Sequence, residues 1–217
     1  MEKAYRGMGM EGSVARWYEK TTRNDMDDYR RLAIRVAAML PLGGDVLEVA
    51  PGPGFLATEM AKTGKLRVTG LDISRTMIEL AKANAEKLGV PATFQHGSAS
   101  QMPFADQSFD FLVCRAAFKN FTDPAGALRE IRRVLRPGGS GLIIDLRRDV
   151  SMAEIGKYVD TLGLGFFDRL FTLLTFRFVL LPRAYTRRQI ETMLRQVPFS
   201  SARVDANAIG MEIWFER

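Results

Sequence analysis

The sequence predicts an α/β fold with a mostly parallel central sheet, helices on both of its faces and an antiparallel hairpin at its C-terminal end. Short apolar segments alternate with amphipathic helical segments between residues 45 and 146, an order typical of right-handed strand–helix–strand crossovers. The segment 109–114 is apolar at nearly every position, as in a central strand that is covered on both sides. Two strand-like segments, 201–205 and 211–215, then close the chain as a hairpin.

Helix boundaries are marked by capping residues. Ser74 is a typical helix N-cap, and Gly89 ends the helix that Ser74 begins. Asp123 followed by Pro124 predicts another helix start. The predicted strands cover 45–50, 66–71, 92–95, 109–114 and 141–146, and the predicted helices between them cover 56–63, 74–88 and 124–135.

The residues before the first strand predict one helix that continues to Leu40. Its arginines are expected to face solvent and its apolar residues to face the core; the outward set is Arg30, Arg31 and Arg35, and the inward set is Leu32, Val36, Met39 and Leu40.

The last third of the chain carries two capping boxes, Ser151-x-x-Glu154 and Thr186-x-x-Gln189. Between them, an apolar helical stripe consists of Phe167, Phe171, Leu174, Phe178 and Leu181. A chain of 217 residues suits one domain. We therefore expect a single domain, 1–217, made of a helical cap (1–44), a ligand-binding core (45–150), an apolar helical insertion that could cover a substrate (151–185), and a C-terminal helix and hairpin (186–217).

Composition excludes several classes of protein. Cys114 is the only cysteine, which rules out a disulfide within the chain and a thiolate metal cluster. The most apolar stretch, 162–181, is interrupted by Asp168, Arg169 and Arg177, so it falls short of the roughly 20 apolar residues of a membrane span. The N-terminal residues show no apolar signal segment, and a cytoplasmic location is expected.

The net charge of +6 is compatible with a nucleic acid, an anionic substrate, an acidic membrane surface or simply a solvated arginine-rich surface. The arginines occur as scattered pairs without a dense basic run. Charge alone therefore does not identify a partner.

The first predicted strand leads into Gly52-Pro-Gly54-Phe-Leu-Ala57, which matches the pattern G-x-G-x-x-[GA]. Glycines at these positions permit a tight turn and a close approach of backbone N–H groups to a ligand. Asp72 follows at the end of the next strand, where a carboxylate can accept hydrogen bonds from both hydroxyls of a ribose. A nucleoside-containing ligand is indicated, although glycines that only shape a turn and an Asp72 that only caps a helix remain alternatives.

Four segments in sequence order carry a family resemblance, and they are Val46–Gly54, Leu71–Ser74, Met102–Val113 and Leu128–Gly139. Together they resemble the motifs of class I S-adenosylmethionine-dependent methyltransferases, and most closely the small-molecule, ubiquinone-biosynthesis-like group (methyltransferase type 11). The resemblance implies a Rossmann-like fold, S-adenosyl-L-methionine as cofactor, S-adenosyl-L-homocysteine as product and no metal.

The resemblance also implies residue roles. Gly52 and Gly54 would pack under the methionine and ribose, Glu48 would order that loop and reach the amino group, and Asp72 would hold the ribose diol. Ile73 would pack on the adenine face, with Ser98 and Ala99 at the adenine edge. The other expected cofactor residues are Ala50, Met77, Arg115 and, from a lid-like N-terminal helix, Tyr18. Many relatives have Asp where this chain has Ser98, so weaker adenine selectivity is expected.

Methyl transfer needs mainly alignment and exclusion of water, so no catalytic residue is assigned. The polar candidates for the acceptor pocket are Lys119, Asn120 and Asp145, and Phe171 and Phe178 are the apolar ones. Relatives often carry a histidine near 118–120, and its absence here puts a histidine base in doubt. The expected acceptor is a small lipophilic or aromatic molecule.

Other functions stay open. A nucleic-acid methyltransferase would account for the charge, but Cys114-Arg-Ala-Ala117 does not match the [DNS]-P-P-[YF] motif, and nucleic acid is not expected as a partner. A short-chain dehydrogenase is disfavoured because no Tyr-x-x-x-Lys is present. A non-catalytic cofactor-binding protein is the remaining alternative. The chain is expected to be a monomer or a homodimer. The insertion could serve as a lid, as a dimer contact, as part of the hydrophobic core or as a weak contact with a membrane surface.

Overall fold

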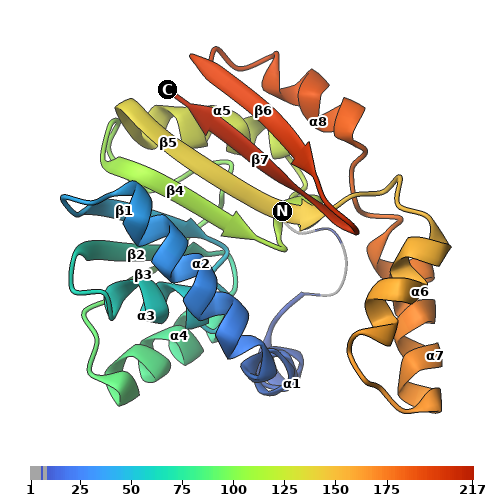
Figure 1. Cartoon of the computed structure of the whole chain (residues 1–217). Helices are drawn as coiled ribbons and strands as arrows, with labels where there is room; N and C mark the ends of the chain where they lie inside the picture. Colours follow the sequence, from blue (N-terminus) through green and yellow to red (C-terminus); the bar gives the residue numbers. More distant parts are fainter. Residues whose placement is uncertain (1–5, 7–8) are drawn as a thin grey trace.

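The computed structural model describes residue 6 and residues 9–217; residues 1–5 and 7–8 of the expected N-terminal cap lie outside the described part. At its centre is a seven-stranded sheet with the order β3-β2-β1-β4-β5-β7-β6 (Figure 1). The strands are β1 (Gly44–Val49), β2 (Leu66–Asp72), β3 (Thr93–His96), β4 (Phe109–Arg115), β5 (Leu135–Leu146), β6 (Ser201–Ala206) and β7 (Gly210–Glu216). The first five run parallel and β7 is antiparallel to both β5 and β6, so the predicted sheet and hairpin are confirmed.

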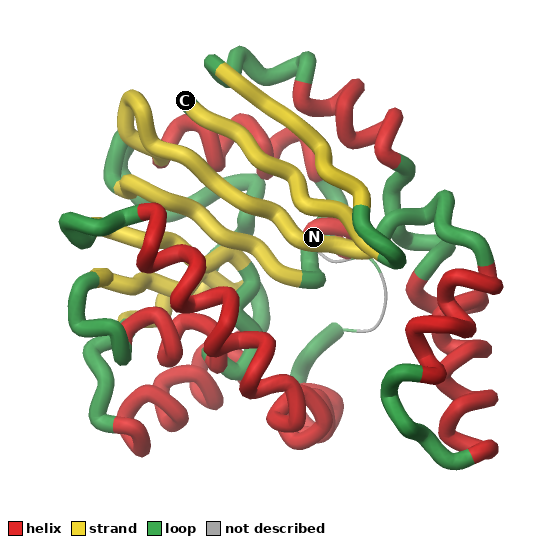
Figure 2. Tube along the Cα trace, viewed as in Figure 1, coloured by secondary structure: helices red, strands yellow, loops and turns green. Residues whose placement is uncertain are grey.

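Helices cover both faces of this sheet (Figure 2). The helices are α1 (Gly12–Thr22), α2 (Met26–Met39), α3 (Phe55–Ala61), α4 (Arg75–Leu88), α5 (Pro124–Val134), α6 (Met152–Asp160), α7 (Phe166–Thr175) and α8 (Arg187–Leu194). Buried residues of α2, α3 and α4 pack on one face, and those of α5 and α8 pack on the other. In β4, Phe111 and Val113 belong to the first cluster and Leu112 to the second, as expected for a strand that is covered on both sides.

The predicted caps form as expected. The Ser74 side chain accepts a hydrogen bond from the Met77 N–H, and Gly89 ends α4 in the left-handed conformation. Asp123 accepts from the Gly126 N–H at the start of α5. Both capping boxes, at the starts of α6 and α8, are present.

The N-terminal helix differs from the prediction because it is broken into α1 and α2 by a 3₁₀ turn, η1 (Arg23–Asp25). No proline or glycine marks this break. It lets α1 turn onto α4, where the Gly12 N–H donates to the Thr76 hydroxyl, a contact between residues far apart in sequence. Met39 was expected to face inward but is exposed at the end of α2, whereas Leu32 and Val36 are buried as predicted.

The fifth strand begins at Leu135, six residues before its predicted start. The Pro137-Gly-Gly139 segment lies between the predicted helix and the predicted strand, and its backbone pairs with the C-terminal residue of the chain. The Gly138 N–H donates to the Arg217 carbonyl, and the Arg217 N–H donates to the Gly139 carbonyl. A register shift between Phe109 and Phe111 accommodates the irregular segment.

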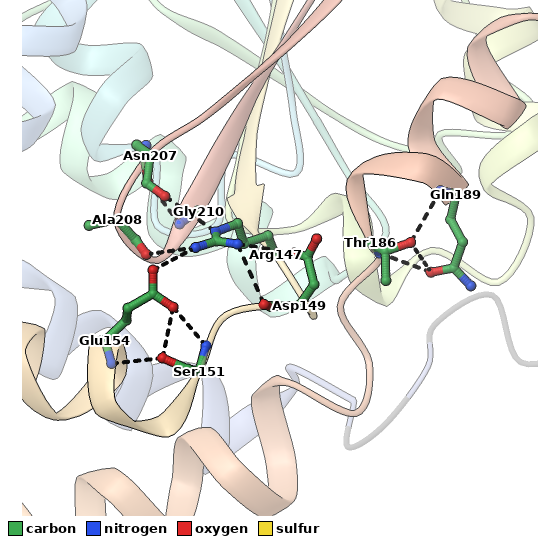
Figure 3. Close-up of polar contacts among 9 residues, drawn as sticks. All are labelled: Arg147, Asp149, Ser151, Glu154, Thr186, Gln189, Asn207, Ala208 and Gly210. Carbon is green, nitrogen blue, oxygen red and sulfur yellow. Dashed lines mark hydrogen bonds and ion pairs between the residues drawn. The ribbon is translucent and has the colours of Figure 1, made fainter.

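The apolar insertion contains α6, α7 and the π-helical turn η3 (Phe176–Leu180), which continues α7. Its small core consists of Val150, Ile155, Val159 and Phe176, separate from the two clusters on the sheet. Arg147 holds its base through an ion pair with Glu154 of the α6 capping box, 2.9 Å away (Figure 3). Among the described residues, no helix is both long and apolar enough to cross a membrane.

Candidate cofactor and acceptor site

The predicted site residues gather at one edge of the sheet. Parallel strands end side by side, so the loops after β1, β2, β3 and β4 meet at the carboxyl edge. Positive φ values occur in these loops at Ala50, Gly52 and Gly54 after β1 and at Ala116 after β4. Alanine rarely adopts this conformation, so the backbone at the ends of β1 and β4 is held by its surroundings.

The glycine loop has two different reasons for its two glycines. A Cβ on Gly54 would lie 2.8 Å from the Ala81 Cβ and 3.0 Å from the Phe94 ring, so Gly54 allows α3 to pack against α4 and β3. A Cβ on Gly52 would meet only the Tyr18 ring, at 3.7 Å. Gly52 therefore has space beside it, as a loop that receives a ligand requires.

Asp72 lies at the end of β2 and ties this loop to α4. Its Oδ2 accepts from the Gly52 N–H at 3.0 Å, and its Oδ1 accepts from the Ser74 N–H at 2.9 Å. The N-cap of α4 is Ser74, so Asp72 is not the residue that caps this helix. Burial raises the pKa of Asp72 to about 6, while the backbone N–H groups act in the opposite direction.

Glu48 is an unusual residue for the interior of β1, because it carries a carboxyl group and is only 3 % exposed. Burial raises its pKa to about 8, opposed by the Ala57 N–H and by the charge of Arg115. Its Oε2 is buried and has no hydrogen-bond partner among the described residues. Buried polar atoms normally have a partner, so this oxygen is suited to a ligand donor.

Tyr18 on α1 lies beside the glycine loop. Its ring lies 3.7 Å from the position that a Cβ on Gly52 would take, and burial raises the pKa of its phenol, on which the charges of Arg115 and Asp72 also act. Asn84 of α4 fixes this arrangement because its amide donates to the Pro53 carbonyl at 3.0 Å and to Glu19 of α1 at 3.1 Å.

The start of α1 is anchored on the start of α4 by Glu11. The Glu11 carboxylate accepts from the Arg75 N–H, the Thr76 N–H and the Thr76 hydroxyl. A carboxylate at a helix N-terminus is favoured by the unpaired N–H groups and the helix dipole. Sequence analysis missed Glu11 and Asn84; an asparagine on the buried side of α4, three residues after Ala81, is a signal that could have indicated the second.

The predicted adenine-side residues lie together after β2 and β3. Ile73 is partly buried, and its carbonyl is hydrogen-bonded to His96 at 3.0 Å. Ser98 and Ala99 are partly buried in the following loop, and the Ser98 hydroxyl contacts the Ser100 hydroxyl at 3.0 Å. Met77 is buried in the first turn of α4. His96 thus holds the backbone beside Asp72.

Arg115 ends β4, next to the other cofactor candidates. Its guanidinium lies 4.5 Å from the centre of the Tyr29 ring and 3.8 Å from Asp28 of α2. Its charge acts on both Glu48 and Tyr18. Arg115 is therefore a shared counter-charge for the groups that border the glycine loop.

Lys119 and Asp145 form a buried ion pair between the turn after β4, η2 (Phe118–Asn120), and β5. The Lys119 Nζ lies 2.8 Å from Asp145 Oδ1, and the Lys119 N–H donates to Oδ2. Both groups are therefore fully engaged with protein partners. The neighbouring Asn120 differs, since its buried Oδ1 has no partner among the described residues.

Phe171 and Phe178 lie on the exposed side of α7 and η3, and the structure does not bring them into contact with the cofactor candidates. Tyr158 of α6 is the aromatic residue of the insertion that lies nearer the site. Burial raises the pKa of Tyr158, and the charges of Asp25, Asp28 and Arg115 act on it.

The described residues support neither a metal site nor a reactive cysteine. No group of three or more metal-binding side chains is found among them. Cys114 is fully buried in β4, where burial raises the pKa of its thiol.

Known proteins resemble this chain in sequence and in fold. The profile of the methyltransferase domain family matches residues 47–143. Demethylmenaquinone methyltransferase of Chlorobaculum parvum is 37 % identical over 124 residues, which are 55 % of this chain and 50 % of that protein. The ubiquinone/menaquinone biosynthesis C-methyltransferase UbiE of Bdellovibrio bacteriovorus is 41 % identical over 106 residues, 48 % of this chain and 44 % of that protein. The chain thus spans about half the length of these relatives.

A similar fold is found in a protein of Methanococcus maripaludis that is assigned as an S-adenosyl-L-methionine-dependent methyltransferase. The match to its crystal structure covers all of this chain and 97 % of the Methanococcus maripaludis chain, with a TM-score of 0.77 and 18 % sequence identity. This match concerns the fold alone. The match to the methyltransferase domain family covers residues 47–143, slightly less than half of this chain, and the likeness of fold extends over its whole length.

Proposed function

We propose that this protein transfers a methyl group from S-adenosyl-L-methionine to a small lipophilic or aromatic acceptor. The observation that carries the cofactor assignment is the unpartnered Oε2 of Glu48, buried beside a glycine loop that is tied to Asp72. A nucleoside that also bears an ammonium group suits these two carboxyl groups, since one can accept from ribose hydroxyls and the other can pair with the ammonium.

In this proposal the residues divide the cofactor between them. Asp72 accepts hydrogen bonds from the ribose, and Glu48 pairs with the amino group. The backbone around Ala50, Gly52 and Gly54 contacts the methionine part. Ile73, Met77, Ser98 and Ala99 border the adenine. Tyr18 covers the glycine loop from α1, and Arg115 supplies a positive charge beside it. The cofactor, when bound, supplies an already activated methyl group on a sulfonium.

The chain's own contribution to the reaction is then alignment and exclusion of water. Asn84 and Glu11 keep α1 against the loop, which holds Tyr18 in place. The Lys119–Asp145 pair fixes the turn after β4, so Asn120 is presented at a constant position. Asn120 is the polar group we assign to the acceptor side, because its buried Oδ1 lacks a partner among the described residues.

The acceptor class rests on the relatives, which are named for demethylmenaquinone and for ubiquinone or menaquinone biosynthesis. The corresponding acceptor here is an aromatic or quinoid ring with an apolar substituent. Phe171 and Phe178 are assigned to the acceptor's apolar part, which requires α7 to approach the site when the acceptor binds. The domain division is part of the proposal: one domain in which 1–44 covers the cofactor and 151–185 serves the acceptor.

The test is incorporation of labelled methyl from S-adenosyl-L-methionine into a short-chain demethylmenaquinone analogue by the whole chain. We expect labelled product, with activity lost in Asp72→Ala. Label in added RNA instead would favour the nucleic-acid alternative. Cofactor binding without label in any of a panel of phenols, quinones and amines would make the chain a non-catalytic cofactor-binding protein and contradict the proposal.

A further inference from the structure

A cleft of about 240 Å³ lies between α2 and the ends of β4 and β5. Figure 1 shows α2 in front of the sheet, with the ends of these two strands beyond it. Within the described part of the chain, the cleft is lined by Asp28, Arg31, Leu32, Arg35, Arg115 and Ile144. We call it the α2 cleft. Arg115 is also a candidate residue of the cofactor site, so the α2 cleft borders that site.

The Arg115 guanidinium makes no hydrogen bond with any described residue, although its side chain is only 24 % exposed. It lies 4.5 Å from the centre of the Tyr29 ring. Its ion pair with Asp28 spans 3.8 Å, which is longer than a hydrogen bond. A guanidinium has five N–H donors, and largely buried polar groups normally have partners. These donors are therefore suited to an anionic ligand.

The other two arginines of the α2 cleft are neutralised by carboxylates of the protein. Arg31 donates to Asp28, and Arg35 donates to both carboxylate oxygens of Glu212. Three arginines and two carboxylates leave one positive charge, which is that of Arg115. A ligand with a single negative charge balances it. A carboxylate has this charge, and its two oxygens match the guanidinium through two parallel hydrogen bonds.

The position of the α2 cleft favours the methyl acceptor as the source of this carboxylate. Most of the cofactor candidates follow β1, β2 and β3, whereas the cleft is bounded by Ile144 of β5, which lies on the far side of β4 from β1. Helix α6 of the insertion faces the same arginine, because the charge of Arg115 opposes the rise that burial causes in the pKa of Tyr158. Arg115 thus lies between the cofactor residues and the part of the chain that we assign to the acceptor.

We propose that Arg115 binds a carboxylate of the acceptor, so that aromatic or quinoid acceptors with a carboxylate are bound in preference to neutral ones. The inference rests on the proposed function, which supplies the cofactor and the aromatic class of the acceptor. Arg115 then selects and positions the acceptor through the two hydrogen bonds of its guanidinium, and it takes no part in the methyl transfer itself.

The experiment is calorimetric titration of the whole chain, saturated with S-adenosyl-L-homocysteine, with 2-naphthoate and with its neutral counterpart 2-naphthamide. We expect the native chain to bind 2-naphthoate at least about tenfold more tightly, since its charged hydrogen bonds are absent from the amide. Arg115→Gln should remove this preference. Arg115→Lys should keep part of it, because the charge remains without the planar fork of donors.

The matched control is Arg30→Gln, which removes an exposed arginine of α2 that pairs with Asp27 outside the α2 cleft and should keep the full preference. Equal binding of both probes by the native chain would overturn the inference, as would a preference that survives Arg115→Gln.

Titrations of Arg115→Gln with S-adenosyl-L-homocysteine and with 5′-methylthioadenosine, which lacks the carboxylate, test the cofactor as the source. A loss for the first ligand alone that exceeds the loss for 2-naphthoate would assign Arg115 to the cofactor carboxylate and overturn the inference. S-adenosyl-L-homocysteine binding by a native chain that shows no preference between the probes would leave the proposed function standing. Failure of the native chain to bind S-adenosyl-L-homocysteine would contradict the proposed function and the inference with it.

Discussion

The Gly52 N–H donates a hydrogen bond to the Asp72 carboxylate across 3.0 Å, so the loop after β1 and the end of β2 are joined at the centre of the candidate cofactor site. The other Asp72 oxygen accepts from the Ser74 N–H. A ligand that donates hydrogen bonds to Asp72 must therefore compete with, or add to, two backbone donors that already orient this carboxylate. This explains why the carboxylate can remain at one position while it is nearly fully buried.

Glu48 makes cofactor binding depend on pH. Its pKa of about 8 leaves it mostly protonated at pH 7, whereas pairing with an ammonium favours the carboxylate. Binding of S-adenosyl-L-homocysteine at pH 7 should release about one proton, and affinity should rise as the pH increases from 6 to 8. Calorimetry in two buffers with different ionisation enthalpies measures the proton release. Glu48→Gln should abolish it, and equal release from both proteins would contradict the assignment.

Gly54→Ala should destabilise the fold more than Gly64→Ala. Both glycines have a positive φ, of 77° and 68°, so each substitution costs about 1 kcal/mol from the backbone. Only Gly54 has close neighbours at the new Cβ, which adds about 1–3 kcal/mol of overpacking. Urea denaturation of the two variants measures the difference. Equal midpoints would show that α3 and α4 can separate at this contact without loss.

Replacing Lys119 tests whether it is a structural partner of Asp145 or a free group in the acceptor pocket. Lys119→Met leaves the buried Asp145 carboxylate without its counter-charge and should lower the free energy of unfolding by about 3 kcal/mol. The control is Asp205→Asn, which breaks an exposed pair with Arg203 and should change stability by no more than about 0.5 kcal/mol. Denaturant titration that gives equally small losses for both variants would count against a structural pair.

Asn84 should hold α1 in place and so slow its cleavage by trypsin. Asn84→Ala removes its bonds to the Pro53 carbonyl and to Glu19, so tryptic cleavage within α1, at Arg16 or Lys20, should become about fivefold faster. Thr21→Ala is the control, because the Thr21 hydroxyl bonds only to carbonyls of α1 itself. S-adenosyl-L-homocysteine should slow the cleavage of both. Equal rates for the two variants would mean that α1 is held by Glu11 without help from Asn84.

Local sequence patterns were sufficient to predict that the candidate cofactor residues lie close together at one edge of the sheet, and their roles remain predictions. Glu48 lies near the end of β1, the glycines follow that strand and Asp72 ends β2, and parallel strands that end side by side bring such residues together. The caps at Ser74 and Asp123 were predictable for the same reason, since each depends on residues within three positions of it. These features need no knowledge of distant contacts.

Features that depend on distant contacts were not predicted. The break after α1 follows from the attachment of Glu11 to Thr76, and the early start of β5 follows from pairing with Arg217, the last residue of the chain. The pairing of Lys119 with Asp145 likewise joins the turn η2 to the end of β5, and helix α5 lies between the two in the sequence. The acceptor side of the site consists of such contacts, and the roles of its candidate residues, like those of the cofactor candidates, remain predictions.

The central claim is that the chain binds the nucleoside of S-adenosylmethionine through Asp72. We would titrate the native chain, Asp72→Ala and the control Asp45→Ala, whose carboxylate lies near the start of β1 and pairs with Arg67, with S-adenosyl-L-homocysteine and with NAD by calorimetry. The account predicts binding of S-adenosyl-L-homocysteine in preference to NAD, weakened about 10–100-fold by Asp72→Ala and unchanged by Asp45→Ala. No binding by the native chain, or a preference for NAD, would contradict it.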